Sequence, residues 1–184
     1  MLNRPVREGL KIAISGKSGC GNSTVSRIVA QTLGLKLINY TFRNIAQERG
    51  MTFEEVCEEA QKDPGYDLYL DKKQVEMARE GNCVLGSRLA IWVLEEADIK
   101  VYLKASPETR AERIREREEG DFEEVLKETL ERDGRDSKRY KELYSIDTDS
   151  FEFADLIIDT ERYNQYQVAE QIINFHAVYK SDVN

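Results

Sequence analysis

A glycine-rich segment at residues 16–24 has the residue types and spacing of a phosphate-binding loop. It follows a short apolar run and precedes a helix-like stretch. Glycines let successive backbone N–H groups turn toward one anion, and a helix N-terminus favours negative charge. A strand-to-helix turn without a ligand is the alternative. The residues expected to bind nucleotide phosphates are Gly16, Lys17, Ser18, Gly19, Cys20, Gly21, Asn22, Ser23 and Thr24.

One position departs from the common loop pattern G-x-x-x-x-G-K-[ST]. Gly16, Gly21 and Ser23 match this pattern, but Asn22 stands where the lysine belongs. An asparagine amide can donate a hydrogen bond to a phosphoryl oxygen, but it supplies no positive charge. We therefore expect Lys17 to supply the missing charge in catalysis, and Ser23 to place its hydroxyl on Mg²⁺.

Two arginines follow other apolar runs of the chain. Arg43 lies after residues 36–39, and Arg88 lies after residues 82–85. Ligands of open parallel sheets bind at the carboxyl ends of the strands, and a guanidinium can bind two oxygens of a phosphate at once. We interpret both arginines as binding an acceptor phosphate; exposed arginines in surface ion pairs are the alternative.

A charged segment at residues 106–141 carries cations at helical spacing. Arg110, Arg113 and Arg117 recur at i, i+3 and i+7, so one helical face would present all three. A second set places an acid between two arginines, which suits a ribose hydroxyl beside a phosphate. A solvated helix with surface salt bridges is the alternative. The second set is Arg132, Asp136 and Arg139.

Short apolar runs that alternate with helix-like stretches would position these residues. Such runs are typical of buried parallel strands, and the alternation predicts a doubly wound α/β sheet. The expected strands are 11–15, 36–39, 82–85, 99–103 and 154–159. The expected helices are 23–33, 41–48, 52–60, 70–80, 89–95 and 167–175, with further charged helix within 106–141.

Composition indicates one globular domain. The 184 residues are 40% hydrophobic and 34% charged, and the net charge of −8 argues against general binding to a nucleic-acid backbone. The cysteines at 20, 57 and 83 lack metal-site spacing, and no apolar run reaches the roughly 18 residues of a membrane span. The first fifteen residues show no signal-peptide run. We expect a cytoplasmic protein, monomeric or alternatively homodimeric, with no nucleic-acid or membrane partner.

Three stretches resemble the cytidylate kinases, in particular the short form of archaea and spirochaetes, within the nucleoside monophosphate kinases of the P-loop class. They are residues 40–51, 85–92 and 131–140, and the resemblance covers about residues 11–160. It implies transfer of the γ-phosphoryl of ATP, with Mg²⁺, to CMP or dCMP. It also implies the three-layer αβα P-loop fold, with a five-stranded parallel sheet.

The same resemblance implies one domain over residues 1–184 with two insertions. The core would comprise residues 1–40, 81–105 and 142–184. An NMP-binding insertion would span 41–80 and a lid would span 106–141, and their closure would exclude water.

The resemblance also assigns roles to residues. In that family an Arg-Asp-x-Arg-Asp-x-x-Arg run holds the phosphate and ribose of CMP, which implies this role for Arg132, Asp136 and Arg139. Arg43 matches the arginine that binds the acceptor phosphate, and Arg88 matches one in the base and phosphate site. The residues expected to act in catalysis are Lys17, Arg132, Arg139 and Arg110, which matches an arginine entering the lid.

Three places in the chain depart from the family pattern. Asn22 replaces the loop lysine, which the archaeal short forms also lack; Gly86 and Ser87 stand where relatives carry an acidic residue; and Leu89 replaces an aspartate of the longer bacterial enzymes. Two alternatives to an active CMP kinase therefore remain: a catalytically impaired nucleotide-binding regulatory module, and a kinase for another small acceptor.

Overall fold

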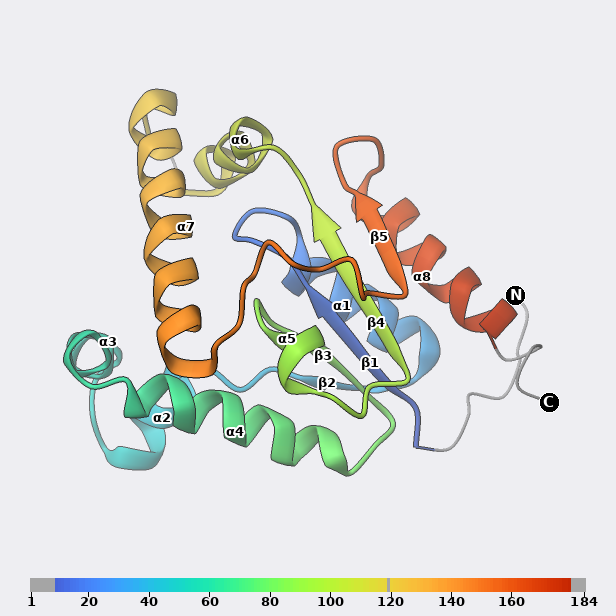
Figure 1. Ribbon diagram of the computed structural model, residues 1–184, viewed down its shortest axis with the longest axis horizontal. Helices are drawn as coiled ribbons and strands as arrows, with labels where there is room; N and C mark the ends of the chain where they lie inside the picture. Colours follow the sequence, from blue (N-terminus) through green and yellow to red (C-terminus); the bar gives the residue numbers. More distant parts are fainter. Residues whose placement is uncertain (1–8, 119, 180–184) are drawn as a thin grey trace.

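A five-stranded parallel sheet lies at the centre of the molecule, with the strand order β2-β3-β1-β4-β5 (Figure 1). The structure is a computed structural model that describes residues 9–118 and 120–179. The strands are β1 (Lys11–Ser15), β2 (Lys36–Ile38), β3 (Cys83–Gly86), β4 (Ile99–Lys104) and β5 (Leu156–Asp159). Each predicted strand is present, with ends shifted by no more than two residues.

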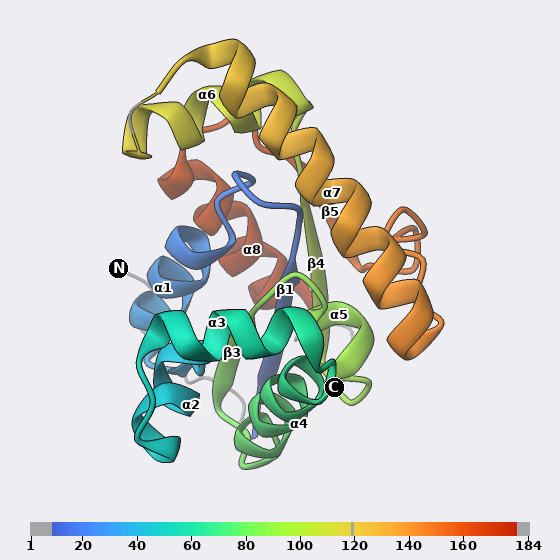
Figure 2. The same ribbon diagram turned by 90° about the vertical axis from the view of Figure 1, so that its left-hand side faces the viewer.

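Helices cover both faces of this sheet and make three layers, which confirms the predicted αβα architecture (Figures 1 and 2). One face packs against α1 and α8, and the other packs against α4 and α5. The helices are α1 (Asn22–Leu33), α2 (Phe42–Arg49), α3 (Phe53–Lys62), α4 (Gly65–Arg79), α5 (Ala90–Val93), α6 (Pro107–Glu118), α7 (Phe122–Tyr144) and α8 (Gln165–Tyr179).

The central strand explains why the strands are continuous apolar runs. Ile12 and Ile14 of β1 point into the core beneath α1 and α8, whereas Ala13 points toward α5, and all three are fully buried. A strand buried on both faces needs apolar residues at every position. Its carboxyl end leads directly into the glycine-rich loop.

The two long connections form helical segments beside the sheet. Helices α2, α3 and α4 fill residues 41–80 around a small core of their own, formed by Tyr40, Ile45, Val56 and Tyr66. Helices α6 and α7 fill the segment from 106, and α7 continues beyond 141 to Tyr144. Figure 2 shows the two helical groups at opposite sides of the loop that follows β1. Their division into separate moving units stays a prediction.

Three predicted helices differ in length from the observed ones by three residues or more, and the one expected at 167–175 spans Gln165–Tyr179. The helix expected at 70–80 begins earlier, at Gly65, because Asp63 accepts a hydrogen bond from the Gly65 nitrogen (2.8 Å) and Pro64 suits a helix start. The helix expected at 89–95 is shorter, because Leu94 leaves the helical conformation (ψ 73°) and turns the chain toward β4.

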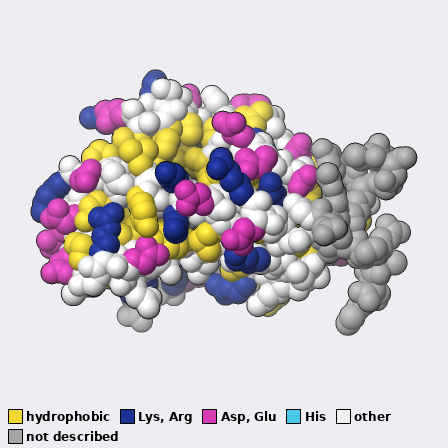
Figure 3. Space-filling view, turned by 90° about the horizontal axis from the view of Figure 1, so that it is seen from below, with side chains coloured by type: hydrophobic (Ala, Val, Ile, Leu, Met, Phe, Trp, Pro, Cys, Tyr) yellow, Lys and Arg dark blue, Asp and Glu magenta, His cyan; other side chains and the backbone are white. Residues whose placement is uncertain are grey.

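Charges of both signs are mixed on the surface seen from below in Figure 3, where Lys and Arg side chains alternate with Asp and Glu around apolar patches. That face therefore presents no continuous basic area. Among the described residues, no helix is both long and apolar enough to span a membrane.

Replacement of glycine by alanine should change the free energy of unfolding in opposite directions at two positions. A Cβ at Gly86 would lie 2.2 Å from Ser26 Oγ, because α1 packs directly against the end of β3, whereas a Cβ at Gly134 in α7 would have no neighbour within 4 Å. We expect Gly86→Ala to lower the free energy of unfolding by about 1–3 kcal/mol through overpacking. Gly134→Ala should raise it by about 0.5–1 kcal/mol through helix propensity. Urea denaturation measures both changes, and effects of the same sign would contradict this packing.

Candidate nucleotide site

The loop between β1 and α1 requires glycine at several positions. Gly19 and Gly21 have φ values of 85° and 98°, which favour glycine. Gly16 has no room for a side chain, because a Cβ there would lie 2.5 Å from the Leu103 carbonyl oxygen. The glycines that predicted the loop are therefore needed for its backbone path.

Asn22 closes the base of this loop. Its Nδ2 donates a hydrogen bond to the carbonyl oxygen of Gly16 at 2.6 Å, and its buried Oδ1 has no hydrogen-bond partner among the described residues. The residue that replaces the usual lysine thus has a structural role that the motif did not reveal. A contact from its second amide hydrogen or its backbone nitrogen to a phosphate stays a prediction.

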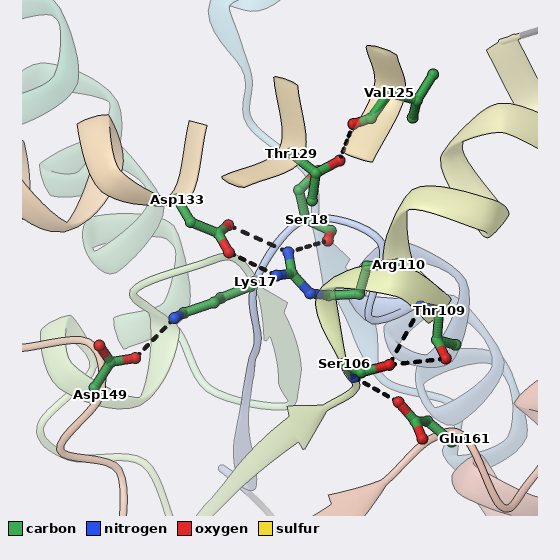
Figure 4. A network of polar contacts seen from close by, with 10 residues as sticks. All are labelled: Lys17, Ser18, Ser106, Thr109, Arg110, Val125, Thr129, Asp133, Asp149 and Glu161. Atoms are coloured by element: carbon green, nitrogen blue, oxygen red, sulfur yellow. Dashed lines mark hydrogen bonds and ion pairs between the residues drawn. The ribbon is translucent and has the colours of Figure 1, made fainter. Parts of the chain in front are cut away.

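Arg110 connects α6 and α7 to the loop (Figure 4). Its guanidinium, only 2% exposed, donates to the Ser18 carbonyl oxygen at 3.1 Å and contacts both carboxylate oxygens of Asp133 at 2.6 and 3.2 Å. Burial of this charge is balanced by Asp133 of α7. In the structure Arg110 lies behind the loop, so it positions the loop; direct action on a phosphate stays a prediction.

Arg113 binds the next part of the loop. It donates to the Gly19 carbonyl oxygen at 3.3 Å, and to the hydroxyl and carbonyl oxygens of Thr160 at 2.9 and 2.7 Å. With these carbonyls bound from behind, the backbone nitrogens of Ser18 and Gly19 make no hydrogen bond within the described part of the chain. Free N–H groups of this kind are what a phosphate requires.

A cavity of about 810 Å³ lies in front of the loop. Its volume is in the range of small-molecule and cofactor sites. Of the three lid arginines expected on one face, Arg113 and Arg117 line this cavity, whereas Arg110 does not. Helical spacing predicted their proximity correctly, but the position of Arg110 differs because its side chain turns inward to Asp133. The lining comprises residues 17–25, Gly86, Ser87, Arg88, Arg113, Arg117, Thr160, Tyr163, Asn164, Gln165, Tyr166 and Val168.

Lys17 lies at the cavity but is paired with an acid. Its Nζ is 2.7 Å from Asp149 Oδ1, and the two side chains are 33% and 66% exposed (Figure 4). Exposed pairs of this kind contribute about 1 kcal/mol or less, so the ammonium can exchange Asp149 for a phosphate at little cost. Its predicted catalytic role is compatible with this position.

The residues assigned to the acceptor form a chain of alternating charges. Arg88 lies 2.9 Å from Asp136, Asp136 lies 3.1 Å from Arg139, and Arg139 lies 3.4 Å from Asp67. The structure thus brings the end of β3, the middle of α7 and the start of α4 together. Asp67 was missed by the sequence analysis, because no local pattern marks it as part of this chain of charges.

Two further predicted residues lie apart from these contacts. The Arg43 guanidinium stacks over the Phe53 ring at 4.3 Å and is exposed. Arg132 is also exposed and has no ion-pair partner among the residues described. Contact of either residue with an acceptor stays a prediction.

Cys20 contributes packing to the loop rather than reactivity. Burial raises the pKa of its thiol to about 11, although Arg110 and Arg113 oppose this shift. The thiol is therefore protonated near neutral pH. Cys83 is similar, because burial also raises the pKa of its thiol to about 11.

Two hydroxyl groups at the cavity fit a magnesium ion carried by a nucleotide. Ser23 is exposed at the start of α1, and the buried Ser87 Oγ has no hydrogen-bond partner in the described chain. No cluster of three or more His, Cys, Asp or Glu that could hold a metal occurs among the described residues. Mg²⁺ often takes few protein ligands and completes its shell with phosphates and water.

The fold is similar to that of the P-loop kinases. Solved structures with this fold include shikimate kinase from Acinetobacter baumannii, with a TM-score of 0.63 and 21% identity over 94% of this chain and 96% of that one. Deoxyadenosine kinase from M. mycoides has a TM-score of 0.55 and 23% identity, covering 90% of this chain and 98% of that one.

Within this class the chain belongs to the cytidylate kinase-like family, whose profile matches residues 11–162. Cytidylate kinase 2 of Borrelia garinii subsp. bavariensis is 48% identical over 167 residues, which cover 89% of this chain and 94% of that protein. Cytidylate kinase of Archaeoglobus fulgidus is 42% identical over 178 residues, covering 95% and 99%. These findings confirm the family resemblance.

The Arg110–Asp133 pair predicts a specific pattern of stabilities. Arg110→Met leaves Asp133 without its partner and should lower the free energy of unfolding by about 3 kcal/mol. The double variant Arg110→Met, Asp133→Leu removes both charges and should recover more than half of this loss. Chemical denaturation of the three proteins measures the coupling, and a double variant less stable than the single one would contradict it.

Proposed function

We propose that the protein transfers the γ-phosphoryl group of ATP to the 5′-phosphate of CMP or dCMP, giving ADP and CDP or dCDP. The observation that carries the proposal is the loop with free backbone N–H groups, which opens to a cavity beside the charge chain of Arg88, Asp136 and Arg139. Membership of the cytidylate kinase-like family supports this choice of acceptor.

The reaction needs positioned charges rather than a side-chain nucleophile. An oxygen of the acceptor phosphate attacks the γ-phosphorus, and the bond from this phosphorus to the β–γ bridging oxygen breaks, so ADP leaves. Catalysis of such a transfer consists of alignment and charge stabilisation. Loop nitrogens, Lys17 and Arg117 would hold the donor, while Arg88 and Arg139 would hold the acceptor.

Magnesium enters this proposal with the nucleotide. Ser23 would contact it directly, and the Ser87 hydroxyl, which lines the same cavity, would act through water. When bound, the ion neutralises charge on the donor phosphates.

The helical segments on either side of the site would limit the hydrolysis of ATP by water. In the proposal, α2–α4 form the acceptor-binding arm and α6 and α7 form the lid, which together exclude water from the reacting phosphates. The proposal takes the enzyme as a monomer, with a homodimer as the alternative. Small soluble nucleotides as substrates agree with the expected cytoplasmic location.

A coupled assay of ADP formation tests the function. Mg-ATP is supplied with CMP, dCMP, UMP or AMP as separate acceptors, and with no acceptor as the control. We expect acceptor-dependent turnover that is fastest with CMP or dCMP. If protein that binds ATP and CMP by calorimetry forms no ADP with any acceptor, the result would contradict the proposal and favour a nucleotide-binding regulatory module.

Replacement of Lys17 tests the source of the missing loop charge. Lys17→Ala should lower kcat by about tenfold or more, because a charge that acts on the transferring phosphoryl is lost, with little change in the KM for CMP. Asp149→Asn is the matched control, because it removes the same ion pair but keeps the ammonium, and it should retain kcat. Equal values of kcat for Lys17→Ala and the unaltered enzyme would show that Lys17 does not compensate for Asn22.

A further inference from the structure

Asp67 is a buried carboxylate with an unsatisfied oxygen. It lies in the first turn of α4, is only 8% exposed, and its Oδ2 makes no hydrogen bond among the described residues. The contact of Oδ2 with Arg139, at 3.4 Å, is an ion pair without hydrogen-bond geometry. Burial raises the pKa of this carboxyl, and Arg139 opposes the shift. A buried acceptor without a donor is energetically costly, and a ligand N–H would remove that cost.

The same face of α4 carries a second unpaired acceptor. Gln74 lies two turns after Asp67 and is 6% exposed. Its Nε2 donates to the Tyr40 carbonyl oxygen at 2.9 Å, which fixes the amide, and its Oε1 has no partner in the described chain. This face therefore offers hydrogen-bond acceptors rather than donors.

Asp67 lies one ion pair beyond Arg139, on the side of the charge chain that faces the arm. Arg88 and Asp136 line a small cavity together with residues 16–18 of the loop, so they lie at the phosphate end. The charge chain leads from them through Arg139 to Asp67 in the arm. A nucleotide with its phosphate at the loop and its ribose along this chain would extend its base toward the arm.

Cytosine and uracil differ in the group at C4 of the base, which such a carboxylate would contact. The 4-amino group of cytosine donates a hydrogen bond, whereas O4 of uracil only accepts one. We propose that Asp67 selects cytosine nucleotides by accepting a hydrogen bond from this amino group. Uracil would leave Asp67 Oδ2 without a hydrogen-bond donor and bring two acceptors together, and a site built around a substrate N–H discriminates strongly against such an analogue.

This inference rests on the proposed function and assigns the base preference of that same acceptor site. Asp67 would be a substrate-binding and specificity residue, without a part in the phosphoryl transfer. Because the amino group is common to CMP and dCMP, the inference predicts discrimination against UMP for both.

Asp67→Asn tests the assignment through a ratio of two acceptors. An asparagine has nearly the same shape, but its amide can turn an N–H toward O4 of uracil. We expect the ratio of kcat/KM for CMP to that for UMP to fall by about tenfold or more, with the value for UMP unchanged or raised. A ratio that stays constant while both values fall together would show that Asp67 only holds Arg139, and would overturn the assignment.

Asp71→Asn is the matched control. Asp71 lies one turn along α4 and accepts a hydrogen bond from the Tyr144 hydroxyl at 2.5 Å, which an asparagine oxygen can also accept. The variant makes the same change of charge on the same helix and should leave the acceptor ratio unchanged. A fall in the ratio equal to that of Asp67→Asn would mean that general charge sets the preference, and would also overturn the assignment.

Calorimetry separates failure of this inference from failure of the proposed function. Absence of turnover with every acceptor would contradict the function. The ratio of the dissociation constants of CMP and UMP, measured in the unaltered protein and in Asp67→Asn, would still decide the role of Asp67. Because both ligands are compared on one protein sample, a partly unfolded variant does not change the ratio.

Discussion

Binding of the loop carbonyls by side chains is the interaction on which the rest of this site depends. A loop can direct its N–H groups at a phosphate only if its carbonyl oxygens turn away and find other donors. Arg110 and Arg113 provide those donors for Ser18 and Gly19, and Asn22 provides one for Gly16. Since the buried charge of Arg110 is balanced by Asp133 of α7, the loop, α6 and α7 form one connected unit. The phosphate site is thereby organised before any nucleotide arrives.

This organisation changes how positive charge reaches the reacting phosphates. The Asn22 side chain closes the loop by binding the Gly16 carbonyl oxygen. Another residue must therefore supply the positive charge that a lysine at this position would provide. Lys17 lies at the cavity but forms an ion pair with Asp149, and Arg139 forms ion pairs with Asp136 and Asp67. Acids that hold cations in this way keep them ordered without a substrate, and an anionic substrate can displace them. In our proposal one of these acids, Asp67, would also give the acceptor site its chemical selectivity, because a buried carboxylate distinguishes donors from acceptors on a base.

The fold could be predicted from the sequence because strands buried on both faces leave an unmistakable local pattern of short apolar runs. The glycine-rich loop could also be predicted, because the local backbone conformation requires each of its glycines. Long-range pairings could not be predicted in this way. Helical spacing placed Arg110 near Arg113 and Arg117, but only the packing of α6 against α7 turns Arg110 toward Asp133. Asp67 and Asp149 were missed for the same reason, because their partners lie more than seventy residues away in the chain.

The claim that the loop is held from behind can be tested by calorimetric titration of ADP. Arg110 does not line the cavity, so its effect on binding must pass through the loop. In the double variant Arg110→Met, Asp133→Leu, confirmed as folded by its thermal transition, the Ser18 carbonyl loses its donor. The account predicts ADP binding about three- to tenfold weaker than in the unaltered protein, the equivalent of one lost hydrogen bond. Equal affinity in the two proteins would contradict it.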